Sequence, residues 1–147
     1  MHPIRTLAIL ASAAVLLLVL TACGAQPVAL TAIPVFPEAV ELQPGASAAA
    51  DSMAESLLGA VSADLNGTIR RYRLPADSSW QAVERFYADA LEDGGWQAAE
   101  ELRSVSERFS STGWLRGTAE REQVLLLSYL PAGADETPLL LVALFSE

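Results

Sequence analysis

The only cysteine, Cys23, closes the tetrapeptide Leu20-Thr21-Ala22-Cys23, in which one aliphatic and two small residues precede the thiol. A lone cysteine in an exported protein raises the question of a free thiol or a bridge to another chain. An apolar run from Leu7 to Leu20 leads into the tetrapeptide, and Arg5 places one positive charge ahead of it. That run has the length of a signal h-region and is short for a membrane span, which needs roughly 20 apolar residues. The pattern predicts an export signal that ends at the cysteine.

The tetrapeptide resembles the lipobox of bacterial lipoprotein signal peptides. The resemblance implies that residues 1–22 are a signal peptide, that Cys23 begins the mature chain, and that its thiol carries a diacylglyceryl group. Two or more acyl chains give stable anchoring, so we expect an extracytoplasmic protein held by its N-terminal lipid on the outer leaflet of the cytoplasmic membrane. An uncleaved N-terminal anchor is the alternative. Residues 23–33 are small and lack periodicity, which predicts a flexible tether.

The mature segment is long enough for one domain, residues 34–147, with a core of its own. Removing residues 1–22 takes away the only histidine, His2, and one of the 9 basic residues, Arg5. The remaining 8 arginines face 18 acidic residues, so the mature net charge is −10. An acidic body is repelled by phosphates and anionic lipid head groups. We therefore expect no nucleic-acid partner and a domain that stands off the bilayer.

The missing residue types limit the chemistry of the mature chain. It has no histidine, no lysine and, once Cys23 is lipidated, no free thiol. These absences exclude Ser-His-Asp and Cys-His catalysis, Schiff-base chemistry, the phosphate-loop lysine and zinc sites built from His or Cys. We therefore predict no catalytic, cofactor-binding or metal-ligating residue and a non-enzymatic role.

Carboxylates remain available, and a glycosidase needs only two of them. A hydrolase of cell-wall or extracellular glycan is therefore an alternative function. The candidate acids fall at predicted helix ends, turns and exposed edges, where a solvated surface is the better interpretation; they are Glu92-Asp93, Glu100-Glu101, Glu120 with Glu122, and Asp135-Glu136. The last pair also allows a calcium site, although two acids without a series of ligands are a weak signal.

Arg70, Arg71 and Arg73 form the only basic cluster of this acidic chain. Arginine binds carboxylates and phosphates with two parallel hydrogen bonds, so the cluster is the candidate contact for an anion or an acidic partner. The alternative is that each arginine pairs with a neighbouring Glu or Asp on the sheet surface. A further hypothesis, a small-ligand binding lipoprotein, requires an apolar pocket near Tyr72 and Trp114.

The three tryptophans have two interpretations. Trp80, Trp96 and Trp114 either line a sugar-binding platform or belong to the core. Trp80 and Trp96 bracket an amphipathic segment, which favours the core for both.

Hydrophobic periodicity predicts the elements that position these residues. We expect one helix over 48–65, with a stripe of Met53, Leu57, Leu58, Val61 and Leu65. A second is capped by Ser78 with Gln81 and carries Trp80, Val83, Phe86, Tyr87, Ala90 and Leu91. Strands are expected at 40–42, 68–74, 96–102, 114–119, 124–130 and 139–145. The last two form a central hairpin covered on both faces, and 104–112 stays open between loop and strand.

Phe86-Tyr87, Leu91 and Gly95-Trp96 form the pattern FYxxxLxxxGW. It resembles the helix-to-strand core of small uncharacterised domains in exported bacterial lipoproteins. The resemblance covers about residues 70–96 and implies a strand, a helix, a Gly-Trp turn and further antiparallel strands. It implies packing and no activity, so Phe86, Leu91 and Trp96 are expected in the core.

These patterns predict an α+β domain with an antiparallel sheet of about five strands and one or two helices packed mainly on one face. The leading functional hypothesis is a membrane-anchored, non-enzymatic binding or scaffolding module. It would contact another protein of the cell envelope through a face or an edge of the sheet.

Overall fold

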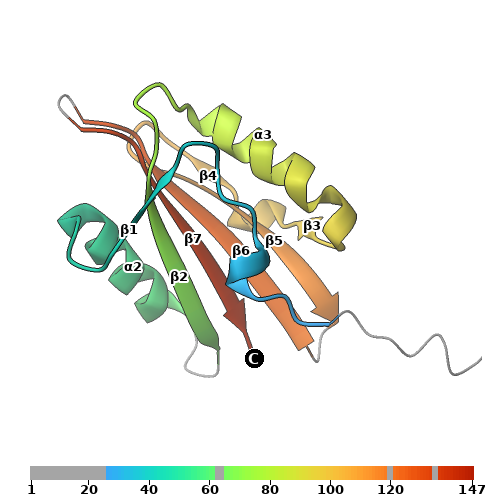
Figure 1. Cartoon of the computed structure of the whole chain (residues 1–147). Coiled ribbons are helices and arrows are strands. Elements are labelled where there is room, and N and C mark those ends of the chain that lie inside the picture. The colour runs from blue at the N-terminus through green and yellow to red at the C-terminus, as the bar shows by residue number, and fades with distance from the viewer. Residues whose placement is uncertain (1–25, 62–64, 119–120, 134–135) are drawn as a thin grey trace, which may run out of the picture.

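The computed structural model describes residues 26–61, 65–118, 121–133 and 136–147. One antiparallel sheet dominates it (Figure 1), in the order β1-β2-β7-β6-β5-β3 with β4 paired to β5 off this path. The strands are β1 (Val40–Leu42), β2 (Asn66–Arg73), β3 (Gln97–Ala98), β4 (Ser104–Val105), β5 (Ser110–Thr118), β6 (Arg121–Leu130) and β7 (Leu139–Ser146). Because β3 and β4 have two residues each, five longer strands form the body of the sheet. The predicted α+β fold is confirmed.

The hairpin of β6 and β7 lies at the centre of the sheet, as its two apolar runs predict. Leu125 stands opposite Leu144 on one face, and Ser128 stands opposite Leu141 on the other, because side chains alternate along a strand. All four side chains are buried. Both faces of the hairpin must therefore be covered by other elements.

The helix α3 (Trp80–Leu91) covers one face, together with the 3₁₀ turn η2 (Leu30–Ala32). Its buried residues recur at spacings of three and four, in agreement with the predicted stripe, and are Trp80, Val83, Tyr87 and Leu91. The stripe is narrower than predicted, since Phe86 is half-buried and Ala90 is exposed. The helix side chains share one core with Trp96, which precedes β3, and with strand residues that include Tyr72, Trp114, Leu125, Leu127, Tyr129 and Leu140.

The helix α2 (Ala48–Ala60) packs on β2 and β7 from the opposite face. It buries Ala50 and Ala54 against Leu141, whereas the buried β7 residues beneath α3 are Leu140, Val142 and Leu144. The two helices therefore cover opposite faces of the sheet, whereas we expected them mainly on one face. Met53 and Leu57 of the predicted stripe are half-buried and pack against the same cluster, but the fully buried helix residues are two alanines that the stripe did not include. Leu58 of the predicted stripe is 48% exposed.

Several predicted boundaries are wrong. The helix predicted to reach residue 65 ends at Ala60, and Asn66-Gly67 begin β2 instead of following a helix end. The N-cap of α3 is Ser79 and not Ser78, because the Ser79 hydroxyl accepts the Ala82 N–H at 3.2 Å. The strand predicted at 96–102 is cut short after β3 by the 3₁₀ turn η4 (Glu100–Leu102). The open stretch 104–112 ends one strand and begins the next.

Residues 26–33, predicted as part of the flexible tether, are packed against the α3-covered face of the sheet. Leu30 and Ile33 are 5% and 4% exposed. The Val28 N–H donates to Gln123 Oε1 at 2.8 Å, and Gln123 Nε2 donates to the Val28 carbonyl at 2.9 Å. These contacts correct the tether prediction for residues 26–33, which we call the N-terminal strap. Residues 23–25 lie outside the described residues.

Candidate functional site

Arg70 and Arg71 point to opposite faces of β2, because they are neighbours on one strand. Arg70 Nε donates to Glu41 Oε1 at 2.9 Å, and the guanidinium carbon lies 5.5 Å from the centre of the Tyr72 ring. The hydrogen bonds from Arg70 hold the pKa of Glu41 below its ordinary value, and those same bonds raise the pKa of Arg70. Arg70 is therefore committed to an ion pair between β2 and β1.

Arg71 faces α2. Its Nε lies 3.0 Å from Asp51 Oδ1 in the first turn of that helix. The other carboxylate oxygen, Asp51 Oδ2, accepts the Gly45 N–H at 2.9 Å. The interpretation that these arginines pair with neighbouring acids is thus confirmed for Arg70 and Arg71, which join strand β2 to its two flanking elements.

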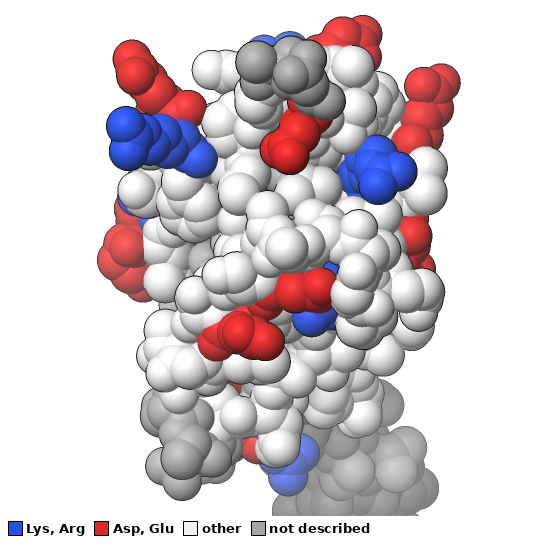
Figure 2. All heavy atoms as spheres, turned by 90° about the vertical axis from the view of Figure 1, so that its left-hand side faces the viewer, with Lys and Arg blue, Asp and Glu red and all other residues white. Residues whose placement is uncertain are grey.

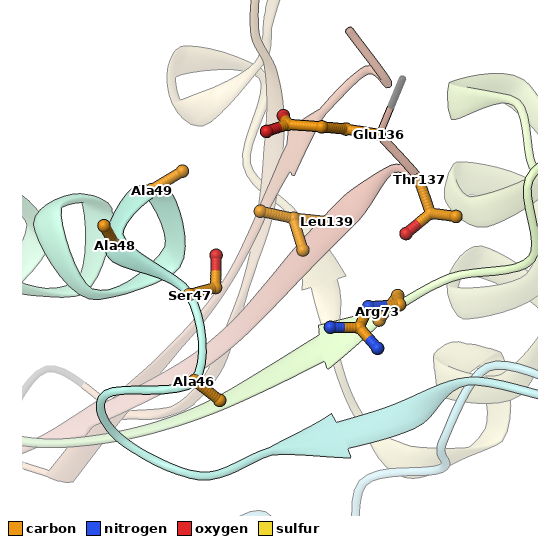
Figure 3. Close-up of a pocket in the computed structure, with 8 residues that line it drawn as sticks. All are labelled: Ala46, Ser47, Ala48, Ala49, Arg73, Glu136, Thr137 and Leu139. Atoms are coloured by element: carbon orange, nitrogen blue, oxygen red, sulfur yellow. The ribbon is translucent and has the colours of Figure 1, made fainter.

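Arg73 is placed differently. It is the last residue of β2, it is exposed, and among the described residues no ion pair involves it. It lines a hollow of about 560 Å³ between the start of α2 and the loop before β7 (Figure 3). We call this the Arg73 hollow; its lining residues are Ala46, Ser47, Ala48, Ala49, Arg73, Glu136, Thr137 and Leu139.

The Arg73 hollow has the chemistry to receive an anionic group next to an apolar one. The first backbone N–H groups of a helix carry partial positive charge, and Ser47 caps this helix by accepting the Ala50 N–H at 3.3 Å. Glu136 and Arg73 project into the hollow from separate sides (Figure 3). The half-buried Leu139 adds an apolar surface between them. A single carboxylate at Arg73 fits this arrangement better than a polyanion, because Glu136 would repel further negative charge.

The side of the molecule that carries α2 has mostly uncharged residues on its visible surface, and the acidic and basic side chains drawn there are scattered (Figure 2). The three arginines lie within four residues of sequence, but two are held in ion pairs on opposite faces of the sheet. The predicted basic cluster therefore does not act as one binding surface.

The aromatic candidates belong to the core. Trp80, Trp96 and Trp114 are 5%, 9% and 5% exposed, and they share one packed cluster with Tyr72. The sugar-platform interpretation is therefore wrong for all three tryptophans. Tyr72 and Trp114 fill the space in which the small-ligand hypothesis expected an apolar pocket.

The acidic candidates do not converge among the described residues. Six of them are exposed, namely Glu92, Asp93, Glu100, Glu101, Glu122 and Glu136. Glu122 lies at the start of β6, and Glu136 lies in the loop before β7 at the other end of the sheet. Glu120 and Asp135 fall outside the described residues. Within the described ranges, no group of three or more His, Cys, Asp or Glu side chains is placed to hold a metal ion.

Sequence reasoning missed Gln123, which fastens the N-terminal strap. Gln123 occupies a core-facing position of β6, two residues before Leu125, and is 6% exposed. A polar side chain at an inward position of an apolar strand needs a hydrogen-bond partner, and this is the signal that could have identified it. Arg116 adds a second fastening, because its Nη1 donates to the Gln26 carbonyl and its Nε to the Gly94 carbonyl at 2.8 Å.

Residues 1–22 and Cys23 lie outside the described residues, so the signal peptide and the lipid attachment stay predictions. In the part of the chain that the structure describes, no helix combines the length and the apolar character needed to cross a membrane. No family model matches the sequence, and neither a curated protein nor a solved structure matches it.

Proposed function

We propose that the protein is a lipid-anchored, non-enzymatic binding module on the outer leaflet of the cytoplasmic membrane. The tetrapeptide Leu20-Thr21-Ala22-Cys23 supports the anchor, and the lack of histidine, lysine and free thiol in the mature chain supports a role without catalysis. The Arg73 hollow is the observation that carries the binding role. It combines an exposed guanidinium, for which the described residues provide no ion pair, with about 560 Å³ of open space.

The partner that suits the Arg73 hollow is another protein of the cell envelope that presents a carboxylate beside an apolar side chain. An exposed ion pair alone contributes only about 0–1 kcal/mol, so the carboxylate has to be accompanied by apolar burial. Leu139 lines the hollow and stands opposite Leu130 in the β6–β7 hairpin, and both are half-buried. These two leucines provide the apolar surface next to Arg73.

The binding role is tested by crosslinking on intact membranes, followed by recovery of the tagged protein. Arg73→Glu is compared with Arg85→Glu, which makes the same charge change at an exposed position of α3. We expect a crosslinked partner with wild type and with Arg85→Glu, and a loss of that partner with Arg73→Glu. Equal recovery with both variants contradicts the role of the hollow. Turnover of a glycan by the purified protein, with no partner recovered, contradicts the proposal as a whole.

The anchor is tested separately with Cys23→Ala. We expect wild type to incorporate radiolabelled palmitate and to sediment with membranes, and the variant to lose the label. A variant that is still labelled and membrane-bound contradicts the lipobox assignment.

A further inference from the structure

The point at which the chain enters the folded domain is fixed on the sheet. Gln26 is the first described residue, and its carbonyl accepts a hydrogen bond from Arg116 of β5. Two residues later, both backbone polar groups of Val28 are held by Gln123 of β6. Leu30 and Ile33 then enter the core. The N-terminal strap is therefore part of the domain from its first described residues onward.

This entry point lies at one end of the sheet. Pro27 shares a hollow with the start of β6 and the C-terminus, lined by Arg121, Glu122, Gln123, Ser146 and Glu147. Asn66, which begins β2, stands opposite Ser146 at the same end. Figure 1 shows the first blue segment beside the end of β5, the start of β6 and the C-terminus. We call the end of the sheet formed by Pro27, Asn66, Arg121, Glu122, Ser146 and Glu147 the anchor end.

The chain between the lipid and the domain is short. Cys23 precedes Gln26 by three residues, and three residues span at most about 11 Å, whatever their conformation. A free tether that ran to residue 33 would instead reach roughly 35 Å at about 3.3 Å per residue. Because the strap is packed on the sheet, the greatest possible distance between Cys23 and the folded domain is much shorter than the sequence predicts. A lipid on Cys23 would hold the anchor end close to the bilayer surface, since the short link sets the limit of their separation.

We infer that the anchor end of the sheet faces the lipid bilayer and that the Arg73 hollow points away from it. This inference rests on the proposed lipid anchor at Cys23. The strand β7 has eight residues and runs from Leu139, in the hollow, to Ser146, at the anchor end. A strand of that length separates its two ends by roughly 25 Å, at about 3.3 Å per residue.

An exposed leucine at the anchor end fits this orientation. Leu58 of α2 is 48% exposed, and a Cβ at Gly67, the second residue of β2, would lie 2.9 Å from its side chain and 2.7 Å from that of Phe145. Leu58 therefore stands beside the start of β2 and the end of β7. At that end it can meet the lipid head-group region, which tolerates apolar side chains. The orientation also leaves the Arg73 hollow open to a partner in the extracytoplasmic space.

The orientation is tested with lipidated, full-length protein in phosphatidylcholine vesicles that contain a head-group spin-labelled lipid. A fluorophore is attached to a cysteine introduced at Glu122, at the anchor end, or at Asp77, in the loop that follows Arg73 and β2; both positions are exposed acids. Cys23 is blocked by its lipid in both proteins. We expect quenching by the spin label to be at least threefold stronger at position 122 than at position 77. Equal quenching, or stronger quenching at position 77, overturns the inference.

A second variant tests whether the short link is the cause. A 20-residue Gly-Ser insertion between Ala25 and Gln26 leaves the strap intact and lengthens only the link. We expect the insertion to bring the two quenching values within about 1.5-fold of each other, and an unchanged difference overturns the inference.

Palmitate labelling and flotation with vesicles are measured first on every protein. A wild-type chain that carries no lipid overturns both this inference and the proposed anchor. A lipidated chain without a quenching difference overturns the orientation alone and leaves the proposed anchor standing.

Discussion

The side-chain amide of Gln123 bonds to both polar groups of one residue, Val28, across 95 positions of sequence. Its oxygen accepts the Val28 N–H at 2.8 Å, and its nitrogen donates to the Val28 carbonyl at 2.9 Å. The Gln123 side chain thereby makes the two hydrogen bonds to Val28 that a residue of a neighbouring strand would otherwise make. A backbone segment that would otherwise lie on the sheet with its polar groups unsatisfied is held in place.

Gln123→Ala should therefore lower the free energy of unfolding by about 1–3 kcal/mol, the usual cost of leaving buried polar groups unpaired. The measurement is urea denaturation of the domain, with hydrogen exchange of the Val28 amide as the local readout. The matched control is Gln43→Ala, at an exposed glutamine. A surface substitution of this kind should change stability by less than about 0.5 kcal/mol.

Gln123→Glu separates the two hydrogen bonds. An ionised carboxylate accepts the Val28 N–H and repels the Val28 carbonyl, whereas a protonated carboxyl can also donate to that carbonyl. The repulsion raises the pKa of this carboxyl in the folded state, so we expect the variant to be destabilised at pH 7 and to recover part of the loss, relative to wild type, as the pH falls from 7 toward the ordinary glutamate pKa of about 4. A variant as stable as wild type at pH 7 would show that the donor bond to Val28 contributes little.

The packing of the N-terminal strap could not be predicted from the sequence. Residues 24–33 have no periodicity, and local pattern predicted a free tether. The hydrogen bonds that hold the strap come from Gln123 and Arg116. Both residues are far from the strap in sequence, so a local pattern cannot reveal these contacts. The opposite holds for α3, where the spacing of the buried residues depends on the helix alone. Four of the predicted residues, namely Trp80, Val83, Tyr87 and Leu91, are buried.

Side-chain size explains the error in α2. The predicted stripe placed Met53 and Leu57 on the inward face, and both pack against the cluster beneath α2, but the structure also buries Ala50 and Ala54 there, which hydrophobicity did not favour. The separation of helix and sheet, which the sequence does not reveal, decides whether an alanine or a leucine fits. The same limit applied to the candidate site. The sequence identified Arg73 within a cluster, but the ion pairs of Arg70 and Arg71 depend on Glu41 and Asp51 from other elements.

Two buried tyrosines should respond in opposite directions to loss of their hydroxyl groups. The Tyr87 hydroxyl is buried and has no hydrogen-bond partner of good geometry among the described residues, whereas the Tyr129 hydroxyl donates to the Ser78 carbonyl at 2.9 Å. Tyr87→Phe should leave the free energy of unfolding unchanged or raise it by up to about 1 kcal/mol, and Tyr129→Phe should lower it by about 1 kcal/mol. Urea denaturation measures both. A clear loss for Tyr87→Phe would reveal a partner for that hydroxyl, for which the Phe36 backbone is the candidate.

Alkaline pH should destabilise the domain through its tyrosines. Burial raises the pKa of Tyr72, Tyr87 and Tyr129 in the folded state, so the unfolded chain loses these protons first. The stabilisation that comes from burying these tyrosines in their neutral form is fully present below the unfolded pKa of about 10. It is lost as the pH rises from there toward the tyrosine pKa values of the folded state. Unfolding free energies measured from pH 8 to 11 should fall above pH 10. Tyr87→Phe should make that fall shallower, and an unchanged slope would contradict the burial of Tyr87.

The N-cap of α3 can be tested at two adjacent serines. Ser79→Ala removes the oxygen that accepts the Ala82 N–H at 3.2 Å. Losing such a cap should cost about 1 kcal/mol of stability. Ser78→Ala keeps the backbone carbonyl that Tyr129 uses, and it should cost less than about 0.5 kcal/mol. Thermal denaturation of the two variants distinguishes the observed cap from the one that sequence predicts, and a larger loss at Ser78 would reverse the assignment.

Two glycines should respond in opposite directions to alanine because their backbones differ. Gly117, near the turn between β5 and β6, has a φ of 109°, and a Cβ there would lie 2.1 Å from the Arg121 carbonyl oxygen. Gly117→Ala therefore combines backbone strain of about 1–3 kcal/mol with a contact that backbone atoms must move to relieve. Gly59 lies in α2, and a Cβ there would meet no atom of the described residues within 4 Å beyond its chain neighbours and the backbone of its own helix.

Gly59→Ala should raise the free energy of unfolding by about 0.5–1 kcal/mol, because alanine loses less backbone entropy in a helix. Gly117→Ala should lower the free energy of unfolding by more than about 2 kcal/mol. It should also broaden the amide resonances of the strap, since Arg116 precedes this glycine and holds the Gln26 carbonyl. Urea denaturation and amide spectra of both variants provide the comparison. A Gly117→Ala protein with wild-type stability would show that the β5–β6 connection does not need a positive φ at that residue.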